Sequence, residues 1–202
     1  MKTKLIGLLL IALMTLALAG CTSAKRLVAE FRPQGGAPLT PATVQLLVQD
    51  LRPGGQFVGP EALSRDLFRE SQGGQVDLTT AFPTGATVSL SHLTVPVMVY
   101  EAVKAKLGGM GVAGQPDTAG AKARVTIIVK ELSIDVVGSD LLSRVSLEAV
   151  IDRPGLNLVH RSNSFAESSK LKLLGDMGGS EILGDALTRA INSLDFSGLN
   201  NF

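Results

Sequence analysis

Apolar and polar residues alternate along several stretches of the chain, which is the pattern of β-strands with one buried face. The first clear stretch covers residues 43–52, where Val44, Leu46 and Val48 share one face. Pro53-Gly54-Gly55 follows at once and ends this strand, because proline and glycine favour turns. Another brief strand is expected at residues 110–113.

Three longer strand-like runs follow one another in the second half of the chain. Alternation is clean in the middle run, where Val145 and Leu147 oppose Arg144 and Glu148. Successive strands with short turns form an antiparallel meander, and alternation indicates that one face is solvated. The three runs cover residues 123–137, 142–152 and 156–165.

Two segments carry apolar residues at helical spacing. The first covers residues 95–107, with Thr94 as the expected cap, Pro96 in the first turn and Gly108-Gly109 at the end. The second covers residues 179–196, with Ser180 as the expected cap. Its apolar stripe must be buried on the sheet, and it consists of Ile182, Leu183, Ala186, Leu187, Ala190, Ile191 and Leu194.

These elements predict the α+β class: a twisted, mainly antiparallel sheet of four to six strands with two main helices packed on one face. Residues 53–94 give a weaker pattern. A short helix at residues 61–70 and a short strand at residues 86–91 are the assignments we consider there. We expect residues 42–202 to form a single domain, since this length suits one domain and not two.

The first twenty residues have the pattern of a secretory signal. Lys2 and Lys4 precede sixteen uncharged residues, fewer than the ~20 that span a bilayer. The segment ends in Leu18-Ala19-Gly20-Cys21, which resembles the bacterial lipobox. That resemblance implies cleavage before Cys21 and attachment of diacylglycerol to its thiol. It also implies acylation of the new amino terminus, with palmitate among the acyl groups. The alternatives are a plain signal peptide and a single membrane-spanning anchor.

The lipobox divides the chain into a signal peptide (residues 1–20), a lipidated tether (residues 21–41) and the periplasmic domain (residues 42–202). Proline and glycine are frequent in the tether, although residues 27–31 alternate and are an alternative edge strand. Thr22 follows Cys21 where an aspartate would favour the inner membrane. The resemblance therefore implies the inner leaflet of the outer membrane, facing the periplasm.

Composition excludes several functional classes. A net charge of +1 gives no electrostatic reason to expect nucleic acid. Aromatic residues make up 4% of the chain and there is no Trp, which disfavours stacking surfaces for bases or sugars. Two His and one Cys are too few for a zinc site built by the protein. We therefore predict neither a metal nor a cofactor.

The order of elements resembles that of YajG-like bacterial lipoproteins, and more distantly that of auxiliary lipoproteins of ABC-type lipid transport systems. The lipobox is followed by a Val-x-Leu-x-Val-x-Asp-x-Arg strand, in which Asp50 and Arg52 share a face as a modest ion pair. A helix, a long strand, a hairpin and a final helix come later. The resemblance implies a periplasm-facing, non-catalytic envelope protein.

A glycine pattern and two histidines offer weak chemical signals. The sequence from Gly109 to Gly114 matches a dinucleotide fingerprint, but that site needs a strand before it and a helix after it. Here a helix precedes it, so we predict a helix end and a turn. His92 and His160 are far apart in the sequence, and no serine nucleophile motif accompanies them. The Gly-rich residues 177–184 are interpreted as the entry to the last helix.

Two carboxylate pairs are the remaining candidates for catalysis. Glu131 and Asp135 project to one strand face, and so do Glu148 and Asp152. Outward faces of strands carry such residues routinely, so we expect no catalytic residues and no enzyme activity. The leading hypothesis is an interaction or accessory protein that offers a sheet edge or a helix–sheet groove to an envelope protein partner. The alternative is an accessory of lipid transport, and a hydrolase is the third class.

Overall fold

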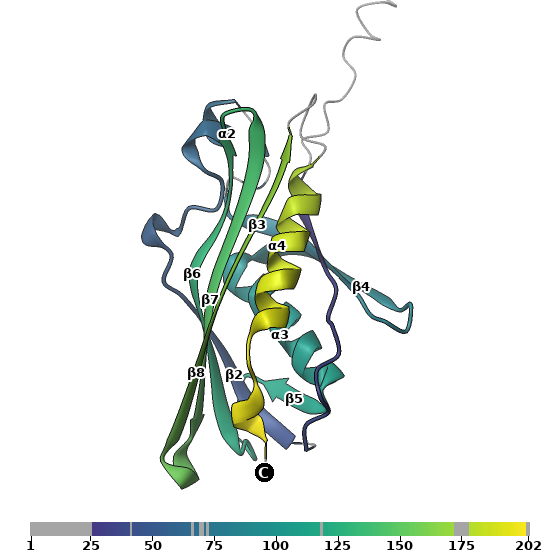
Figure 1. The fold of residues 1–202 in the computed structure, drawn as a ribbon, viewed down its shortest axis with the longest axis vertical. Helices are drawn as coiled ribbons and strands as arrows, with labels where there is room; N and C mark the ends of the chain where they lie inside the picture. Colours follow the sequence, from purple (N-terminus) through teal and green to yellow (C-terminus); the bar gives the residue numbers. More distant parts are fainter. Residues whose placement is uncertain are drawn as a thin grey trace, which may run out of the picture.

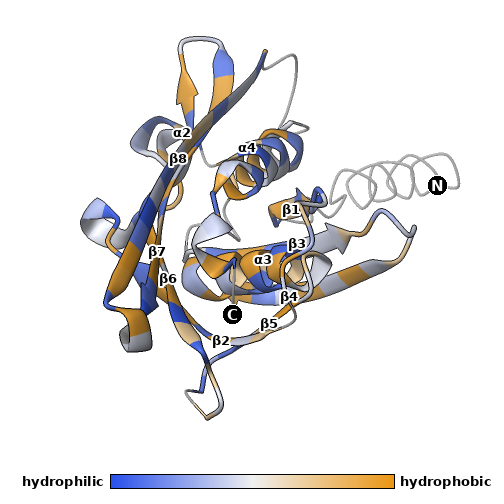
Figure 2. Ribbon diagram, turned by 60° about the horizontal axis from the view of Figure 1, so that its bottom comes forward, coloured by the Kyte–Doolittle hydropathy of each residue, from blue (hydrophilic) through white to orange (hydrophobic). Residues whose placement is uncertain are grey.

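The computed structural model describes residues 26–40, 42–65, 67–68, 71, 73–117, 119–171 and 178–200. Within these ranges the chain forms two β-sheets and places its two long helices between them (Figure 1, Figure 2). The predicted α+β class is therefore confirmed.

The larger sheet has five strands, which are β2 (Ala42–Asp50), β5 (Val112–Gln115), β6 (Ala123–Val137), β7 (Asp140–Arg153) and β8 (Leu158–Leu171). Their order across the sheet is β5-β2-β6-β7-β8. The last three strands pair antiparallel, with Val125 opposite Ile151 and Val145 opposite Ala166. This is the predicted meander.

The other half of this sheet corrects the prediction of a mainly antiparallel sheet. Strand β2 pairs in parallel with both β5 and β6. A parallel pair needs a crossover connection, and α3 (Val95–Gly109) supplies it between β2 and β5. Alternation of apolar residues does not reveal the direction of a neighbouring strand, so the sequence pattern alone missed this pairing.

The inner face of the large sheet carries the core. Val125 and Val129 of β6 are fully buried, and so are Leu132 and Ile134 further along the strand. Buried positions are two residues apart up to Val129, and the next one is Leu132, three residues on. The spacing changes because the pairing with β7 shifts between Val129 and Glu131, as in a β-bulge. The bulge turns consecutive residues at this point toward the outer face and keeps both halves of β6 in register with the core.

A second sheet of three strands was not predicted. It consists of β1 (Val28–Phe31), β3 (Gln75–Ala81) and β4 (Thr87–Thr94), in the order β1-β3-β4. β1 runs parallel to β3, and β3 and β4 form an antiparallel hairpin. The short strand expected at residues 86–91 corresponds to β4, whereas β3 was missed.

The two predicted main helices are α3 and α4 (Gly179–Ser193), each of 15 residues. α4 packs on β7, β8 and β1, and α3 packs on β2, β5 and β3. A short third helix, α2 (Pro60–Ser64), packs on β6 in place of the longer one expected at residues 61–70. Three one-turn 3-10 helices complete the described elements: Pro53–Gly55, Pro154–Leu156 and Ser197–Leu199.

The described part of the expected tether packs on the domain. Leu27 and Phe31 are almost fully buried, and β1 is the edge strand that was the alternative for residues 27–31. Beyond β1, the buried ammonium group of Lys106 donates to the carbonyl oxygen of Gln34 at 2.5 Å. Burial lowers the pKa of Lys106. Residues 27–34 are therefore held along their length and are not part of a free tether.

Candidate functional site

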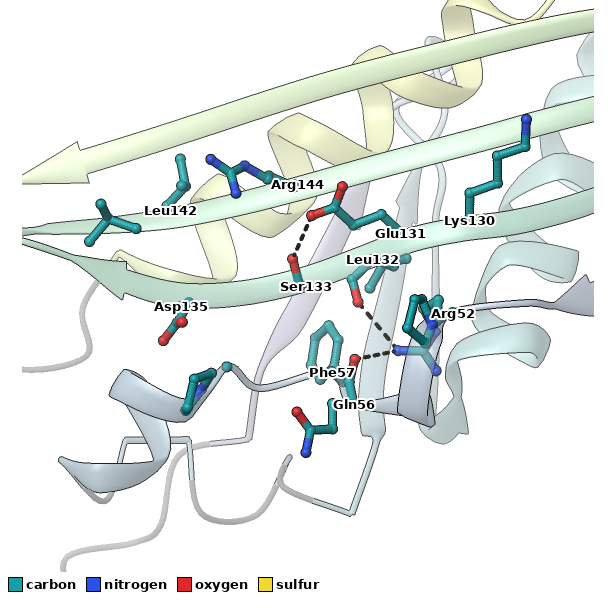
Figure 3. A pocket seen from close by; sticks show the side chains of 14 residues that line it. Arg52, Gln56, Phe57, Lys130, Glu131, Leu132, Ser133, Asp135, Leu142 and Arg144 are labelled. Atoms are coloured by element: carbon teal, nitrogen blue, oxygen red, sulfur yellow. Dashed lines mark hydrogen bonds between the residues drawn. The ribbon is translucent and has the colours of Figure 1, made fainter.

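A pocket of about 410 Å³ lies between the loop after β2 and the outer face of β6 (Figure 3). Arg52 organises it: Nε and Nη2 donate to the two carboxylate oxygens of Asp50 at 2.8 and 2.7 Å. Nη1 also donates to the carbonyl oxygens of Gln56 and Leu132, at 3.2 and 3.3 Å. The predicted ion pair between Asp50 and Arg52 is thus confirmed, and it fastens the loop to the sheet.

This ion pair is largely shielded from solvent. The Arg52 side chain is 6% exposed and that of Asp50 is 24% exposed. The hydrogen bond from Arg52 holds the pKa of Asp50 below its ordinary value, against the opposing effect of burial. Asp50 is therefore held as a carboxylate bound to Arg52, which is a structural arrangement and not that of a proton donor or acceptor poised for catalysis.

The first predicted carboxylate pair lines this same pocket. Asp135 accepts a hydrogen bond from the backbone N–H of Ala62 at 2.8 Å, so it caps the first turn of α2 from the neighbouring strand. Glu131 accepts a weak bond from the hydroxyl group of Ser133 at 3.4 Å. Residues four positions apart along a strand are separated by about 13 Å, more than the roughly 5–9.5 Å between the two carboxyl groups of a glycosidase. Sharing a pocket does not make Glu131 and Asp135 a catalytic pair.

The second pair lies on the outer face of β7, where Glu148 is bound by two cations. The carboxylate of Glu148 binds Lys130 and Arg161 at 2.7 Å each. Hydrogen bonds from these two cations, that of Lys130 first, lower the pKa of Glu148. Asp152 is four residues further along the same strand, at a comparable spacing of about 13 Å. Glu148 is therefore the centre of a cross-strand charge cluster that joins β6, β7 and β8.

The structure does not bring the two histidines together. His160 on β8 lies 3.1 Å from the carboxylate of Asp195, just after α4. Asp195 also accepts from Ser197, whose backbone N–H is the main cause of its lowered pKa. His92 lies at the other end of α4, where its Nε2 is 2.8 Å from Arg26. Each histidine fastens a chain segment, and they share no site.

The glycine pattern is the end of a helix, as predicted. Gly109 is the last residue of α3, Gly111 has a positive φ of 84°, and β5 starts at Val112. A strand follows the glycines in place of the helix that would present its amino terminus to a phosphate. Of the Gly-rich residues 177–184, the described ones, from Gly178 on, enter α4, as expected. Here one detail is corrected: the N-cap is Gly178, and Ser180 accepts a hydrogen bond from the N–H of Val28.

A second hollow was not predicted, and we name it the β4–β5 groove. It has a volume of about 520 Å³ and lies between the β3–β4 hairpin, the end of α3 and strand β5. β4 and β5 are edge strands of their respective sheets. The apolar residues that line the groove are Phe82, Val88, Leu90, Ala105, Val112 and Ala113.

The groove was missed because three separate segments build it. Its only signal in the sequence was the alternation of Val88 and Leu90, two apolar residues on a strand of which both faces are largely exposed. Val88 is 48% exposed because little packs on either face of its strand. An apolar lining between two sheet edges is chemically suited to an extended apolar peptide or to a hydrocarbon chain.

Cys21 and the rest of the lipobox lie outside the described residues, so the predicted lipidation site has no structural test here. Among the helices of the described residues, none has the length and apolar character needed to span a bilayer. Within the same residues no group of three His, Cys, Asp or Glu is placed to hold a metal ion.

Comparison with known proteins gives structural likeness only. No family model and no curated protein matches the sequence. Among solved structures, protein XCC0632 from Xanthomonas campestris, of the family DUF330, is 15% identical, with coverage of 85% of this chain and 95% of that one and a TM-score of 0.45. The PelC dodecamer from Paraburkholderia phytofirmans is 11% identical, with coverage of 80% and 95% and a TM-score of 0.41.

Lipoprotein GNA1162 from Neisseria meningitidis is also similar, at 13% identity, with coverage of 79% of this chain and 94% of that one and a TM-score of 0.26. The structural neighbours thus include a bacterial lipoprotein. None of these proteins is named as YajG-like, and that resemblance stays a prediction. At these identities and TM-scores, the likenesses tell nothing of what this chain binds.

Proposed function

We propose that this chain is a lipid-anchored protein of the bacterial cell envelope, held in the membrane by acyl groups on Cys21. One observation carries the proposal: the only cysteine of the chain follows Leu18-Ala19-Gly20, directly after an uncharged, Leu-rich segment. Each buried methylene contributes about 0.8 kcal/mol of membrane affinity, and stable anchoring takes two acyl chains. Thr22 after Cys21 supports the outer membrane, with the domain facing the periplasm.

We further propose a non-catalytic role in binding an envelope partner through the β4–β5 groove. The carboxylates that were candidates for catalysis support this, because Asp135 caps a helix and Glu148 is bound between two cations. The groove offers edge strands on both sides and an apolar lining, which suits a partner segment that adds as a strand and inserts apolar side chains. A lipid-transport accessory would place a hydrocarbon chain there instead.

The anchor is tested by the substitution Cys21→Ser. Cells that express the native chain and are fed an alkyne-tagged fatty acid should yield a labelled, processed protein. The variant should carry no label and should retain residues 1–20, because lipid transfer to the thiol precedes cleavage in the pathway that the lipobox implies. A variant with Thr22→Ser, which keeps the thiol, is the matched control. Undiminished labelling of Cys21→Ser would exclude this anchor.

The groove is tested by photocrosslinking in intact cells. A photoreactive amino acid at Val88, which lines the groove, should form a defined protein adduct. The same amino acid at Val97, which is 44% exposed on α3 and does not line the groove, is the control and should form none. An adduct of phospholipid at Val88 would favour the transport accessory. Equal yields at the two positions, or none at either, would remove the groove as a binding site.

A further inference from the structure

The point at which the chain enters the domain is fixed at the first turn of α4. The N–H of Leu27 donates to the hydroxyl oxygen of Ser71 at 3.1 Å, and the N–H of Val28 donates to that of Ser180 at 3.0 Å. Leu27 is 2% exposed. Any segment before Arg26 therefore starts from a rigid position beside the amino terminus of α4.

From this point the chain runs alongside α4 toward its carboxyl end. The N–H of Arg32 donates to the hydroxyl oxygen of Thr188, and the N–H of Gln34 donates to the side-chain oxygen of Asn192. These partners lie two and three turns beyond Ser180 on the helix. The direction of the described segment is thus set: it begins beside the start of α4 and runs toward the end of the helix.

The start of α4 lies at the same end of the molecule as the turn between β6 and β7. Lys170, near the end of β8, pairs with Glu181 in the first turn of α4. Strand register then places Leu171 opposite Asp140, and Asp140 opposite Val137. We call this surface the anchor end: residues 137–140, 170–171 and 179–181. In Figure 1, the β6–β7 turn, the end of β8 and the start of α4 lie together at the top.

The anchor end carries exposed apolar side chains in positions that a lipid surface would cover. Val137 and Leu171 are 57% and 53% exposed, on the outer face of the sheet. The chain from Cys21 to Arg26 advances five residues, which reach at most about 18 Å. β6 has 15 residues and is about 50 Å long, so the opposite end of the sheet is beyond this reach.

We propose that the anchor end rests on the membrane that holds Cys21, with Val137 and Leu171 in contact with lipid. The inference rests on the proposed lipidation, since without it the short connection has no fixed origin. Apolar side chains beside an acyl anchor add buried area at the interface. The turn between β7 and β8, with exposed Leu156 and Val159, then points into the periplasm.

The test uses the lipidated protein in vesicles of phosphatidylethanolamine and phosphatidylglycerol. The single variants Val137→Cys and Leu171→Cys report on the anchor end, and Leu156→Cys and Val159→Cys are controls at the other end. All four positions are at least half exposed, so the folded state tolerates them. An environment-sensitive fluorophore is attached to the new thiol, because the sulfur of Cys21 is blocked by lipid. Lipids brominated on their acyl chains should quench the fluorophore at 137 and 171 and leave it unchanged at 156 and 159.

Flotation separates the two proposals. Cys21→Ser is made here without residues 1–20, because an uncleaved apolar segment would itself bind lipid. If the labelled protein floats with the vesicles and this form of Cys21→Ser does not, the anchor is present. Absence of quenching at 137 and 171, or equal quenching at both ends, then overturns the orientation. If neither the native chain nor Cys21→Ser floats, the lipid anchor itself is wrong, and the orientation is lost with it.

Discussion

At the scale of single residues, Gly184 shows how closely α4 and β1 approach each other. A Cβ at this position would lie 2.7 Å from the carbonyl oxygen of Glu30 and 2.8 Å from its nitrogen. Both of these are backbone atoms of a paired strand, so they cannot move aside as the end of a flexible side chain would. Glycine at this position is therefore required by the contact between the helix and the strand.

We predict opposite effects of alanine at two helical glycines. Gly184→Ala gains about 1 kcal/mol of helix propensity. Overpacking costs about 1–3 kcal/mol, and a clash with backbone atoms lies near the upper end, so the net effect is a destabilisation of up to about 2 kcal/mol. Gly108→Ala in α3 meets no atom within 4 Å and should stabilise the fold by about 0.5 kcal/mol. Urea unfolding measures both free energies. A stabilising Gly184→Ala would show that β1 does not press on α4.

At the scale of elements, the sequence pattern predicted the parts of the fold whose two faces differ most. β6 alternates between buried and exposed positions apart from its bulge, and the stripe of α4 is buried along its length. β4 was predicted only as a short strand at residues 86–91, because nearly all of its positions are exposed and the alternation is weak. For β1 the sequence left two interpretations, a tether and an edge strand, because four residues are too few to establish a period.

The candidate site was predictable only where its groups are close in sequence. The ion pair between Asp50 and Arg52 follows from two positions on one strand, and the structure confirms it. The contact between Asp135 and the N–H of Ala62 joins groups 73 positions apart, which no local pattern encodes. The β4–β5 groove depends in the same way on how two sheet edges approach each other. Tertiary packing decided both features, and alternation carries no information about partners.

At the scale of the whole molecule, β1 connects the proposed anchor to both layers of the fold. It pairs with β3 in the small sheet and packs on α4, which in turn covers the large sheet. Ala29 and Phe31 turn inward from it and are fully buried. A force on Cys21 would therefore act on the core of the protein, and the anchor end keeps a fixed orientation as long as β1 stays in place.

This role of β1 predicts a large loss of stability when its inward side chain is removed. Phe31 is 0% exposed, so Phe31→Ala should lower the free energy of unfolding by about 3–5 kcal/mol, through lost burial and the cavity left behind. Phe165 is 61% exposed on the outer face of β8, and Phe165→Ala should change it by less than about 0.5 kcal/mol. Urea unfolding of the two variants makes the comparison. If both changes are equally small, residues 27–31 contribute nothing to the fold and are the free tether first expected from their composition.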